Sequence, residues 1–495
     1  MSKVYLVGAG PGDPELITVK GRRVLAEADC VLYDHLANES LLRYAPAGAE
    51  RVYVGKKRSA HACSQDEISA LLVERARRGL TVVRLKGGDP FIFGRGGEEM
   101  EALAAAGIPF EVVPGVTTPL GIAAYCGVPL THRSHTSVVT FVTGHAVEAI
   151  DWDRVGKAET LVVFMGLTHL REIAAEIVAR GRAASTPALA VRWATRPDQQ
   201  TVAGTLGDLA DRVEAAGMKP PATIVIGEVV ALRRQFNWFE RLPLFGRRIV
   251  VTRAQEQAEE FSAKLAALGA EVVELPAIAI RPAADPAPLD RALARLGEYD
   301  WLLFTSVNGV RFFLERLDAS PCDWRQLRAR ICAIGPATRR AVEALHLKVD
   351  LTPEEYVAES LLAAFGDVDL AGKRVLLPRA AVARDLIPAE LRRRGAEVDV
   401  VEAYRTVVPA ESEPLAREIF GAGSRKPDWV TFTSSSTVKN LLALAGREAL
   451  EGVRVASIGP VTSETARRHG LTVTVEANPF TTDGLIQAIA AAARE

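Results

Sequence analysis

The sequence predicts an α/β protein with more than one domain. Short β-branched runs alternate with stretches rich in Ala, Leu, Glu and Arg at helical spacing, and this alternation continues along the whole chain. A chain of 495 residues is too long for a single hydrophobic core. A hydrophobic content of 48% and a charged content of 24% are ordinary for a globular protein, so we do not expect long disordered regions.

Charge, cysteine usage and hydropathy exclude several classes of protein. The formal net charge of -1 gives no global positive field that would attract nucleic acid. The five cysteines are scattered without a CxxC pair or zinc-like spacing, which favours reduced thiols and predicts neither a metal site nor a disulfide framework. No apolar stretch approaches the ~20 residues needed to cross a bilayer, and the amino terminus shows no basic leader. We therefore expect a cytoplasmic protein that binds neither membrane nor nucleic acid.

A break in the α/β pattern divides the chain near residue 243. Before it, strands are expected at 4–7, 82–85, 138–142, 161–164 and 223–226. The segment 235–245 then reads QFNWFERLPLF, with aromatic residues, a proline and no clear periodicity, and a new strand starts after Gly246. We predict one part over residues 1–242 and another over residues 246–495.

The second part contains an internal repeat. Three segments return in the same order roughly 126 residues further along, which favours two similar α/β domains facing each other. Clefts between such domains commonly bind ligands. The matching pairs are GRRIVVTRA at Gly246 with GKRVLLPRA at Gly372, FTSVNGV at Phe304 with FTSSSTV at Phe432, and IGPATRRAV at Ile334 with IGPVTSETA at Ile458.

Two glycine-rich turns follow expected strands in the first part. The first, GAGPGD from Gly8, places its third glycine too early for a dinucleotide fingerprint, and Pro11 removes an amide that would bind phosphate. A plain strand-to-helix turn is an equal alternative for this motif. The second, RLKGGDPFIFGRGGEE from Arg84, combines bare glycine backbone with the carboxylate of Asp89. That combination suits a cationic sulfonium ligand and would repel a pyrophosphate.

The first part resembles uroporphyrinogen-III C-methyltransferase over about residues 1–240. The resemblance is carried by GAGPGDPELIT, DHL, GKK, RLKGGDPFIFGRGGEE, PGVTT, GVPLTHR and FMG, in this order. It implies the two-domain α/β tetrapyrrole methylase fold, with S-adenosyl-L-methionine in the interdomain cleft and S-adenosyl-L-homocysteine as its product. It further implies two methylations of uroporphyrinogen III to precorrin-2, on the route to sirohaem and cobalamin, and a homodimer formed through this half.

The same resemblance implies roles for individual residues. Asp34 matches the family's proposed general base and Lys56 its proposed general acid, with a cap after a strand and a solvated charge as the respective alternatives. The implied cofactor contacts are Pro11, Gly87, Gly88, Asp89, Ile92, Thr117, Thr118, Met165 and Ala194, the last standing where the family has a GT motif. Cations near the motifs that could meet substrate carboxylates are Lys57, Arg58, His61, Arg95, His132, Arg133 and His135.

The second part carries hydroxyl-rich turns in place of a phosphate loop, metal cluster or catalytic triad. These turns read TSVN from Thr305 and TSSS from Thr433, each after an expected strand. Free amides and hydroxyls at helix starts can bind carboxylates, and we expect the same residues to cap the helices.

The second part contains an ordered run of motifs: VTRA, FTSVNGV, IGPATRRAV, YVAESLL, VLLPRAAVARDLIPAELRRRGAEV, AYRT, FTSSSTV, IGPVTSETA and ANPFTTDGL. With these motifs it resembles uroporphyrinogen-III synthase over about residues 246–495. The resemblance implies two α/β domains joined by a two-strand ladder, with 247–278 and 403–495 in one domain and 282–400 in the other. It implies cofactor-free closure of hydroxymethylbilane, with inversion of the last ring and loss of water. Tyr404 matches the candidate proton donor, with a core aromatic as its alternative, and the expected substrate contacts are Arg253, Ser306, Arg379, Ser434 and Thr462.

The sequence leaves other functions open. The first part could be a later precorrin methyltransferase, a diphthine-synthase-like enzyme or a nicotinamide oxidoreductase, although the long RLKGGDPFIFGRGGEE motif disfavours the first two. The second part could be a non-catalytic module that only binds tetrapyrrole. Because the two implied reactions are consecutive, a bifunctional enzyme of tetrapyrrole biosynthesis is favoured. The sequence does not distinguish a sirohaem from a cobalamin destination.

Overall fold

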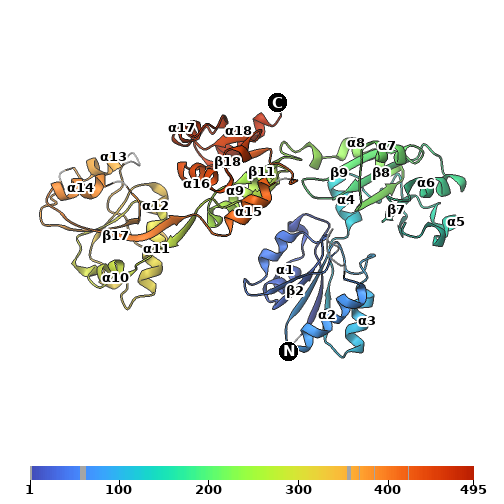
Figure 1. The fold of residues 1–495 in the computed structure, drawn as a ribbon, viewed down its shortest axis with the longest axis horizontal. Helices are drawn as coiled ribbons and strands as arrows, with labels where there is room; N and C mark the ends of the chain where they lie inside the picture. Colours follow the sequence, from blue (N-terminus) through green and yellow to red (C-terminus); the bar gives the residue numbers. More distant parts are fainter. Residues whose placement is uncertain are drawn as a thin grey trace. The chain divides into compact units, whose positions relative to one another are not determined.

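The computed structural model describes residues 3–55, 63–353, 358–366, 368–383, 385–421 and 423–494. The chain forms two compact units. The first consists of residues 1–248 with 264–271 and 493–495, and the second of residues 249–263 and 272–492. Within these described residues the strands form four sheets of five strands each. Helices accompany the strands (Figure 1), and none of the described helices is long and apolar enough to cross a membrane.

The first sheet of the first unit is parallel throughout. Its order is β3-β2-β4-β1-β5, formed by β1 (Val4–Gly8), β2 (Cys30–Tyr33), β3 (Glu50–Tyr53), β4 (Val82–Lys86) and β5 (Phe110–Val113). Successive residues pack on opposite faces: Val7 shares a core with α1 (Val19–Ala26), and Leu6 shares one with α2 (Gln65–Arg77) and α3 (Gly96–Ala105). Helices thus bury both faces, as a parallel sheet requires.

The second sheet of the first unit is mixed, in the order β6-β7-β10-β8-β9. Its strands are β6 (Val139–Thr143), β7 (Thr160–Phe164), β8 (Pro187–Arg192), β9 (Gln200–Thr205) and β10 (Ala222–Ile226); β6 and β7 are parallel and the other pairs antiparallel. One face packs on α5 (Trp152–Val155), α6 (Leu170–Ala179) and α7 (Leu209–Ala215). The other face packs on α4 (Thr118–Cys126), the helix that follows β5, so α4 links the two sheets.

The aromatic segment near the expected boundary packs on the first unit. It begins within α8 (Arg233–Phe236), and the buried Phe239 ring lies 4.7 Å from the ring of Tyr125. The Glu240 carboxylate accepts hydrogen bonds from Gln199 over 2.8 Å and from Thr201 over 2.6 Å. This segment is therefore held in place by the first unit.

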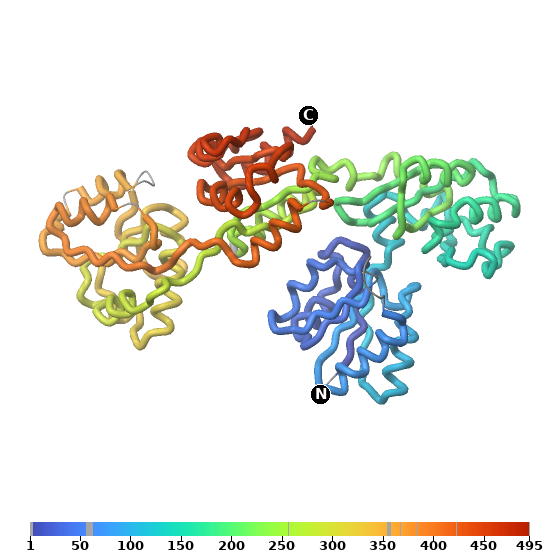
Figure 2. The backbone as a smooth tube through the Cα atoms, in the orientation of Figure 1, coloured from blue at the N-terminus to red at the C-terminus, as the bar shows by residue number. Residues whose placement is uncertain are grey.

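The two sheets of the second unit each combine strands from both copies of the repeat. The order β12-β11-β18-β19-β20 contains β11 (Arg248–Val251), β12 (Glu271–Glu274), β18 (Trp429–Phe432), β19 (Arg454–Ser457) and β20 (Val473–Glu476). The order β13-β17-β16-β14-β15 contains β13 (Ala279–Pro282), β14 (Trp301–Phe304), β15 (Arg330–Ala333), β16 (Arg374–Ala380) and β17 (Glu397–Val407). The chain leaves along β13 and returns along β17, and these strands pair antiparallel (Figure 2).

Helices cover the sheets of the second unit. The first sheet shares a core with α15 (Ser412–Phe420), α16 (Ser435–Ala445) and α17 (Pro460–Arg468); α9 (Gln255–Ala267) follows β11 and α18 (Thr482–Ala492) follows β20. The second sheet packs one face on α10 (Ala287–Leu293), α11 (Val307–Asp318) and α12 (Pro336–Glu343), and the other on α13 (Ala358–Ala364) and α14 (Leu386–Arg393).

Candidate active sites

Three loops of the first unit meet at the carboxyl edge of its parallel sheet, where ligands of such sheets commonly bind. The loop after β1 pairs with the loop after β4, because the Gly10 amide donates to the Gly88 carbonyl over 3.2 Å and the Gly88 amide to the Gly10 carbonyl over 2.8 Å. The loop after β2 packs on Gly87, where an added Cβ would lie 2.5 Å from the Leu36 Cβ. Both glycine motifs and the segment of Asp34 are therefore brought together.

Glycine is required where these loops touch. A Cβ on Gly8 would lie 2.5 Å from the Gly115 Cα, and one on Gly115 would lie 2.3 Å from the Gly88 carbonyl oxygen, so neither position can hold a side chain. Gly88 itself is different. It has a left-handed φ of 68°, and a Cβ there would have its nearest contact at 3.7 Å, with Thr118. A Cβ at Gly88 would thus fit in ordinary van der Waals contact with Thr117 and Thr118.

The Asp89 carboxylate ties the loop after β4 to the loop after β5. Its Oδ1 accepts from the Phe91 amide over 2.8 Å, and its Oδ2 accepts from the Gly115 amide over 3.0 Å. The chain then continues through Thr117, the N-cap residue of α4. Each carboxylate oxygen keeps a further lone pair for a cationic or hydrogen-bonding ligand.

Loops of the second sheet reach the first glycine motif within this unit. The Asp13 amide donates to the Thr195 hydroxyl over 2.8 Å, and a Cβ on Gly12 would lie 2.7 Å from the Ala194 carbonyl oxygen. The segments of Pro11 and Ala194 are therefore adjacent. The Phe93 ring lies 4.9 Å from the ring of Phe164, the residue before Met165. This contact places the segment of Ile92 beside the segment of Met165.

The loops around this edge are strained and expose apolar side chains. Left-handed φ values occur at five non-glycine residues here: Phe93, Arg95, Met165, Trp193 and Thr195. Each such conformation costs about 1–3 kcal/mol and is typical of ligand-binding loops. Met165 and Ile92 are 53% and 36% exposed although both are large and apolar. These features favour a binding site at this edge.

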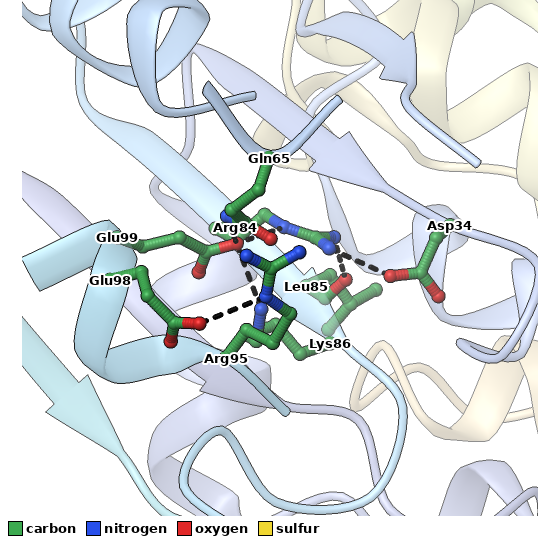
Figure 3. Close-up of polar contacts among 8 residues, drawn as sticks. All are labelled: Asp34, Gln65, Arg84, Leu85, Lys86, Arg95, Glu98 and Glu99. Carbon is green, nitrogen blue, oxygen red and sulfur yellow. Dashed lines mark hydrogen bonds and ion pairs between the residues drawn. The ribbon is translucent and has the colours of Figure 1, made fainter. Parts of the chain in front are cut away.

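A buried chain of charges lies beside the Asp34 loop (Figure 3). Arg84 and Lys86 of β4 are each 4% exposed, and Glu99 of α3 is fully buried. Arg84 Nη2 donates to Asp34 Oδ2 over 2.7 Å, while Arg84 Nε and Lys86 Nζ donate to Glu99 Oε1 over 3.2 and 2.8 Å. Burial, together with the nearby Arg84 charge, lowers the pKa of Lys86 despite the opposing effect of Glu99.

Sequence reasoning assigned no role to Arg84, Lys86 or Glu99. The available signal was a pair of cations two residues apart in a strand expected to be buried, where apolar residues are the rule. Their shared partner Glu99 carried no signal of its own, because a glutamate in a helix is usually exposed.

The remaining predicted residues of the first unit are the expected general acid and the cations expected to meet substrate carboxylates. Lys56, the expected general acid, lies outside the described residues, as do Lys57, Arg58 and His61. Arg95 pairs with Glu98 over 2.9 Å (Figure 3). The remaining cations, His132, Arg133 and His135, lie between α4 and β6, and the two histidine rings are 4.8 Å apart.

The candidate residues of the second unit form two groups, one on each sheet. In the first group, Arg253 follows β11, Ser434 is the N-cap residue of α16 after β18, and Thr462 lies in the first turn of α17 after β19. In the second group, Ser306 is the N-cap residue of α11 after β14, Arg379 lies near the end of β16, and Tyr404 lies in β17. The expected helix caps at Ser306 and Ser434 are confirmed. Because the strands of each group are parallel neighbours, each group gathers toward one carboxyl edge.

Tyr404 is held in a defined position. Its hydroxyl lies 3.0 Å from the Ser306 Oγ, which also accepts from the Gly309 amide over 3.0 Å. The Phe312 ring stacks on the Tyr404 ring at a centroid distance of 5.8 Å. The phenol is therefore oriented by both a hydrogen bond and an aromatic contact.

The two arginines of this unit have different surroundings. Arg253 donates to Gln257 Oε1 over 3.2 Å, and burial lowers the pKa of its guanidinium. Arg379 donates to Asp385 over 2.6 Å. A partly buried guanidinium gains from a carboxylate ligand, which suits Arg253 to a polycarboxylate substrate.

Neither a thiol pair nor a metal-binding group emerges in the described residues. All five cysteines are free, and burial raises the pKa of Cys30 to about 11 and the pKa values of Cys126 and Cys332 to about 12. Thiols with such values are poor nucleophiles at neutral pH. Among the residues that the structure describes, no group of three or more His, Cys, Asp or Glu side chains could hold a metal ion.

The fold and the sites define a tetrapyrrole methylase followed by a synthase of the HemD class. The family model for tetrapyrrole (corrin/porphyrin) methylases matches residues 3–210, and the model for uroporphyrinogen-III synthase HemD matches residues 259–487. The porphyrin biosynthesis protein HemD of Ruminiclostridium josui is 37% identical over 489 residues, which cover 98% of this chain and 96% of that protein. The chain belongs to the family in which these two enzymes are fused, and it is a bifunctional enzyme of tetrapyrrole biosynthesis.

Two further proteins are similar to parts of the chain. Uroporphyrinogen-III C-methyltransferase of Bacillus subtilis is 39% identical over 347 residues, covering 69% of this chain and 71% of that protein. A crystal structure of uroporphyrin-III C-methyl transferase from Thermus thermophilus, complexed with S-adenyl homocysteine, has 45% sequence identity. The aligned region covers 47% of this chain and 100% of the Thermus thermophilus chain, with a TM-score of 0.41.

The residues of the first unit fit S-adenosylmethionine, which supplies a methyl group carried on a positively charged sulfur. Gly88 borders a space that a Cβ would fill, Thr117 and Thr118 stand beside it, and Asp89 offers a carboxylate fixed by two amides. A carboxylate at this position favours a cationic ligand over a phosphate.

Replacing Gly88 with alanine should weaken cofactor binding. Gly88→Ala places a methyl group in the space beside Thr118, so we expect the affinity for S-adenosylhomocysteine to fall at least about tenfold, equivalent to about 1.4 kcal/mol. Isothermal titration of the full chain measures this. The left-handed φ adds a destabilisation of roughly 1–2 kcal/mol, visible in thermal unfolding.

Gly79→Ala is the matched control. Gly79 also has a left-handed φ, of 88°, and a Cβ there meets nothing within 4 Å. This variant should show a similar loss of stability with unchanged affinity. Equal affinities of the two variants would contradict a cofactor position beside Gly88.

Proposed function

We propose that the chain catalyses two consecutive reactions. Residues 246–495 close hydroxymethylbilane to uroporphyrinogen III, with inversion of the last ring and loss of water. Residues 1–242 methylate that product twice to precorrin-2, with S-adenosyl-L-methionine as the methyl donor. One observation carries the proposal. In a chain of this family, bare glycine backbone and the Asp89 carboxylate lie together at one sheet edge. Fusion raises the concentration of the shared intermediate near its next site.

In the methylation, correct orientation of the methyl donor and the acceptor carbon supplies most of the rate enhancement. The donor is held by Pro11, Gly87, Gly88, Asp89, Ile92, Thr117, Thr118, Met165 and Ala194. Asp34 takes the proton that leaves the macrocycle, and Lys56 returns a proton. The position of Asp34 supports this role, since its side chain is 20% exposed at the same edge and is oriented by the Leu36 amide over 3.0 Å.

In the ring closure, Tyr404 donates a proton to the departing hydroxyl, which leaves as water. The Gly309 amide already donates to the Ser306 Oγ, so the Ser306 hydrogen can be donated to the Tyr404 oxygen. The Tyr404 hydrogen is then free for the substrate. Arg253, Ser306, Arg379, Ser434 and Thr462 contact the substrate, and the two arginines meet its carboxylates.

The subdomain division of the synthase part forms part of the proposal. Residues 247–278 and 403–495 build one subdomain and 282–400 the other. The antiparallel pairing of β13 with β17 supports a two-strand connection between them.

The intact chain tests both reactions. Hydroxymethylbilane supplied alone should be converted to uroporphyrinogen III, and addition of S-adenosylmethionine should carry the product on to precorrin-2, followed by absorbance and mass spectrometry. Methylation of added uroporphyrinogen III without any acceleration of ring closure would show that the second part is a non-catalytic module. Ring closure without methylation would refute the assignment of the first part.

Replacing Tyr404 with phenylalanine should slow ring closure. Tyr404→Phe removes the proton donor and keeps the aromatic contact with Phe312, so the rate should fall about 100-fold, within the usual range for general acid catalysis. Tyr299→Phe is the control, because the Tyr299 hydroxyl is also buried but donates to Asp399 over 2.6 Å. Stopped assays of both variants measure the effect, and similar rates for the two would exclude Tyr404 as the proton donor.

We also propose that the chain is a cytoplasmic homodimer joined through its methyltransferase half. Five free thiols suit a reducing compartment. Light scattering of the purified chain should give about twice the monomer mass of 53.2 kDa. A monomeric mass at micromolar concentration would refute the dimer, and recovery of the protein outside the cytoplasmic fraction would refute the location.

A further inference from the structure

The middle strand of the first parallel sheet carries two charged side chains. A strand with a purely structural role would have apolar side chains at these positions. β4 lies at the centre of the order β3-β2-β4-β1-β5, and helices cover both faces of that sheet. Arg84 and Lys86 stand two residues apart and therefore project from the same face of β4. Burial of an ionised group costs several kcal/mol unless it is paired.

Each of these charges is paired, and the pairs form one chain. Lys86 donates to Glu99, Arg84 donates to Glu99, and Arg84 also donates to Asp34 (Figure 3). Two cations and two anions alternate along it, so the buried set is formally neutral. Gln65 adds a further donor to Glu99 Oε1 over 3.3 Å.

The Arg84 guanidinium is fixed from three sides. In addition to Glu99 and Asp34, its Nη1 donates to the Leu85 carbonyl oxygen over 2.8 Å. The planar group cannot rotate without losing at least one of these bonds. Its direction, and with it the position of the donor that faces Asp34, is therefore set by Glu99 and the backbone.

Asp34 is the member of this chain that reaches the surface. Its side chain is 20% exposed, compared with 5% or less for Arg84, Lys86 and Glu99. Its second oxygen accepts from the Leu36 amide, and Leu36 packs on Gly87 of the cofactor loop. The other end of the chain, Lys86, directly precedes Gly87. Both ends thus adjoin the proposed cofactor site.

We propose that Arg84 is a positioning residue for Asp34, and that Glu99, with Lys86 as its second counter-charge, holds Arg84 in place. The inference rests on the role of Asp34 proposed above. Stability alone does not account for the arrangement, because apolar side chains of similar volume commonly stabilise a core as well as or better than a buried ion network. A base whose orientation sets the reaction rate gives a reason to retain it.

A mutant cycle on the full chain tests the inference. Arg84→Lys and Glu99→Gln should each lower kcat for methylation about 10- to 100-fold, because a small misplacement of a reacting group has effects of this size. Affinity for S-adenosylhomocysteine should stay within about twofold, which separates a positioning role from a loss of the binding site. In an Asp34→Asn background, Arg84→Lys should change kcat by less than about twofold, since its effect acts through Asp34.

Two controls make the result interpretable. Binding of S-adenosylhomocysteine by the same preparations reports an intact methyltransferase unit. Arg75→Lys is the matched control, because Arg75 forms a comparable partly buried pair with Glu50, over 2.9 Å, at the start of β3 and so at the opposite edge of the sheet. It should leave methylation unchanged.

The outcomes separate this inference from the function on which it rests. Two results would overturn the positioning role while the parent chain still methylates. One is an equal effect of Arg84→Lys with and without the Asp34 carboxylate. The other is loss of S-adenosylhomocysteine binding in both Arg84→Lys and Glu99→Gln. Absence of methylation by the parent chain would overturn the proposed function and this inference together.

Discussion

Direct contact between backbones is the constraint on which the methyltransferase site depends. Gly8, Gly88 and Gly115 approach so closely that no Cβ fits at Gly8 or Gly115, and the Asp89 carboxylate joins the loop after β4 to the loop after β5 through the Gly115 amide. The position of the carboxylate is thus set by main-chain geometry and not by a flexible side chain. Such a preorganised site loses little entropy when a ligand binds. The exposed apolar residues around this site, among them Met165, therefore surround a backbone whose position is fixed.

The same edge depends on electrostatics within the core. A parallel sheet ordinarily has apolar strands, and β4 departs from that rule with Arg84 and Lys86. Because Glu99 and Asp34 neutralise them, the charges are paired where they are buried, which offsets part of the cost of removing them from water. The arrangement connects the rigid glycine loops to the one carboxylate that reaches the surface. The proposed donor site and Asp34, the proposed base, therefore adjoin the same arrangement.

The synthase unit brings together residues proposed as substrate contacts from segments that are distant in the sequence. Parallel pairing of β11 with β18 brings Arg253 near the turns of Ser434 and Thr462, although these residues belong to different copies of the repeat. Likewise, Ser306 of the first copy contacts Tyr404 of the second. Neither group contains a strong acid, a strong base or a nucleophile held against one. That composition suits a reaction in which the enzyme mainly folds a reactive chain.

Local features were determined by the sequence itself. Turn chemistry and periodicity depend on neighbouring residues, so the strand expected at 4–7, the glycine turns and the caps at Ser306 and Ser434 could all be predicted, and long ordered motifs identified both families. Tertiary structure alone decided that 235–245 packs on the first unit and that Arg84 joins Glu99, 15 residues away, to Asp34, 50 residues away. Such partners follow from packing between distant elements, which leaves no periodic trace in the chain.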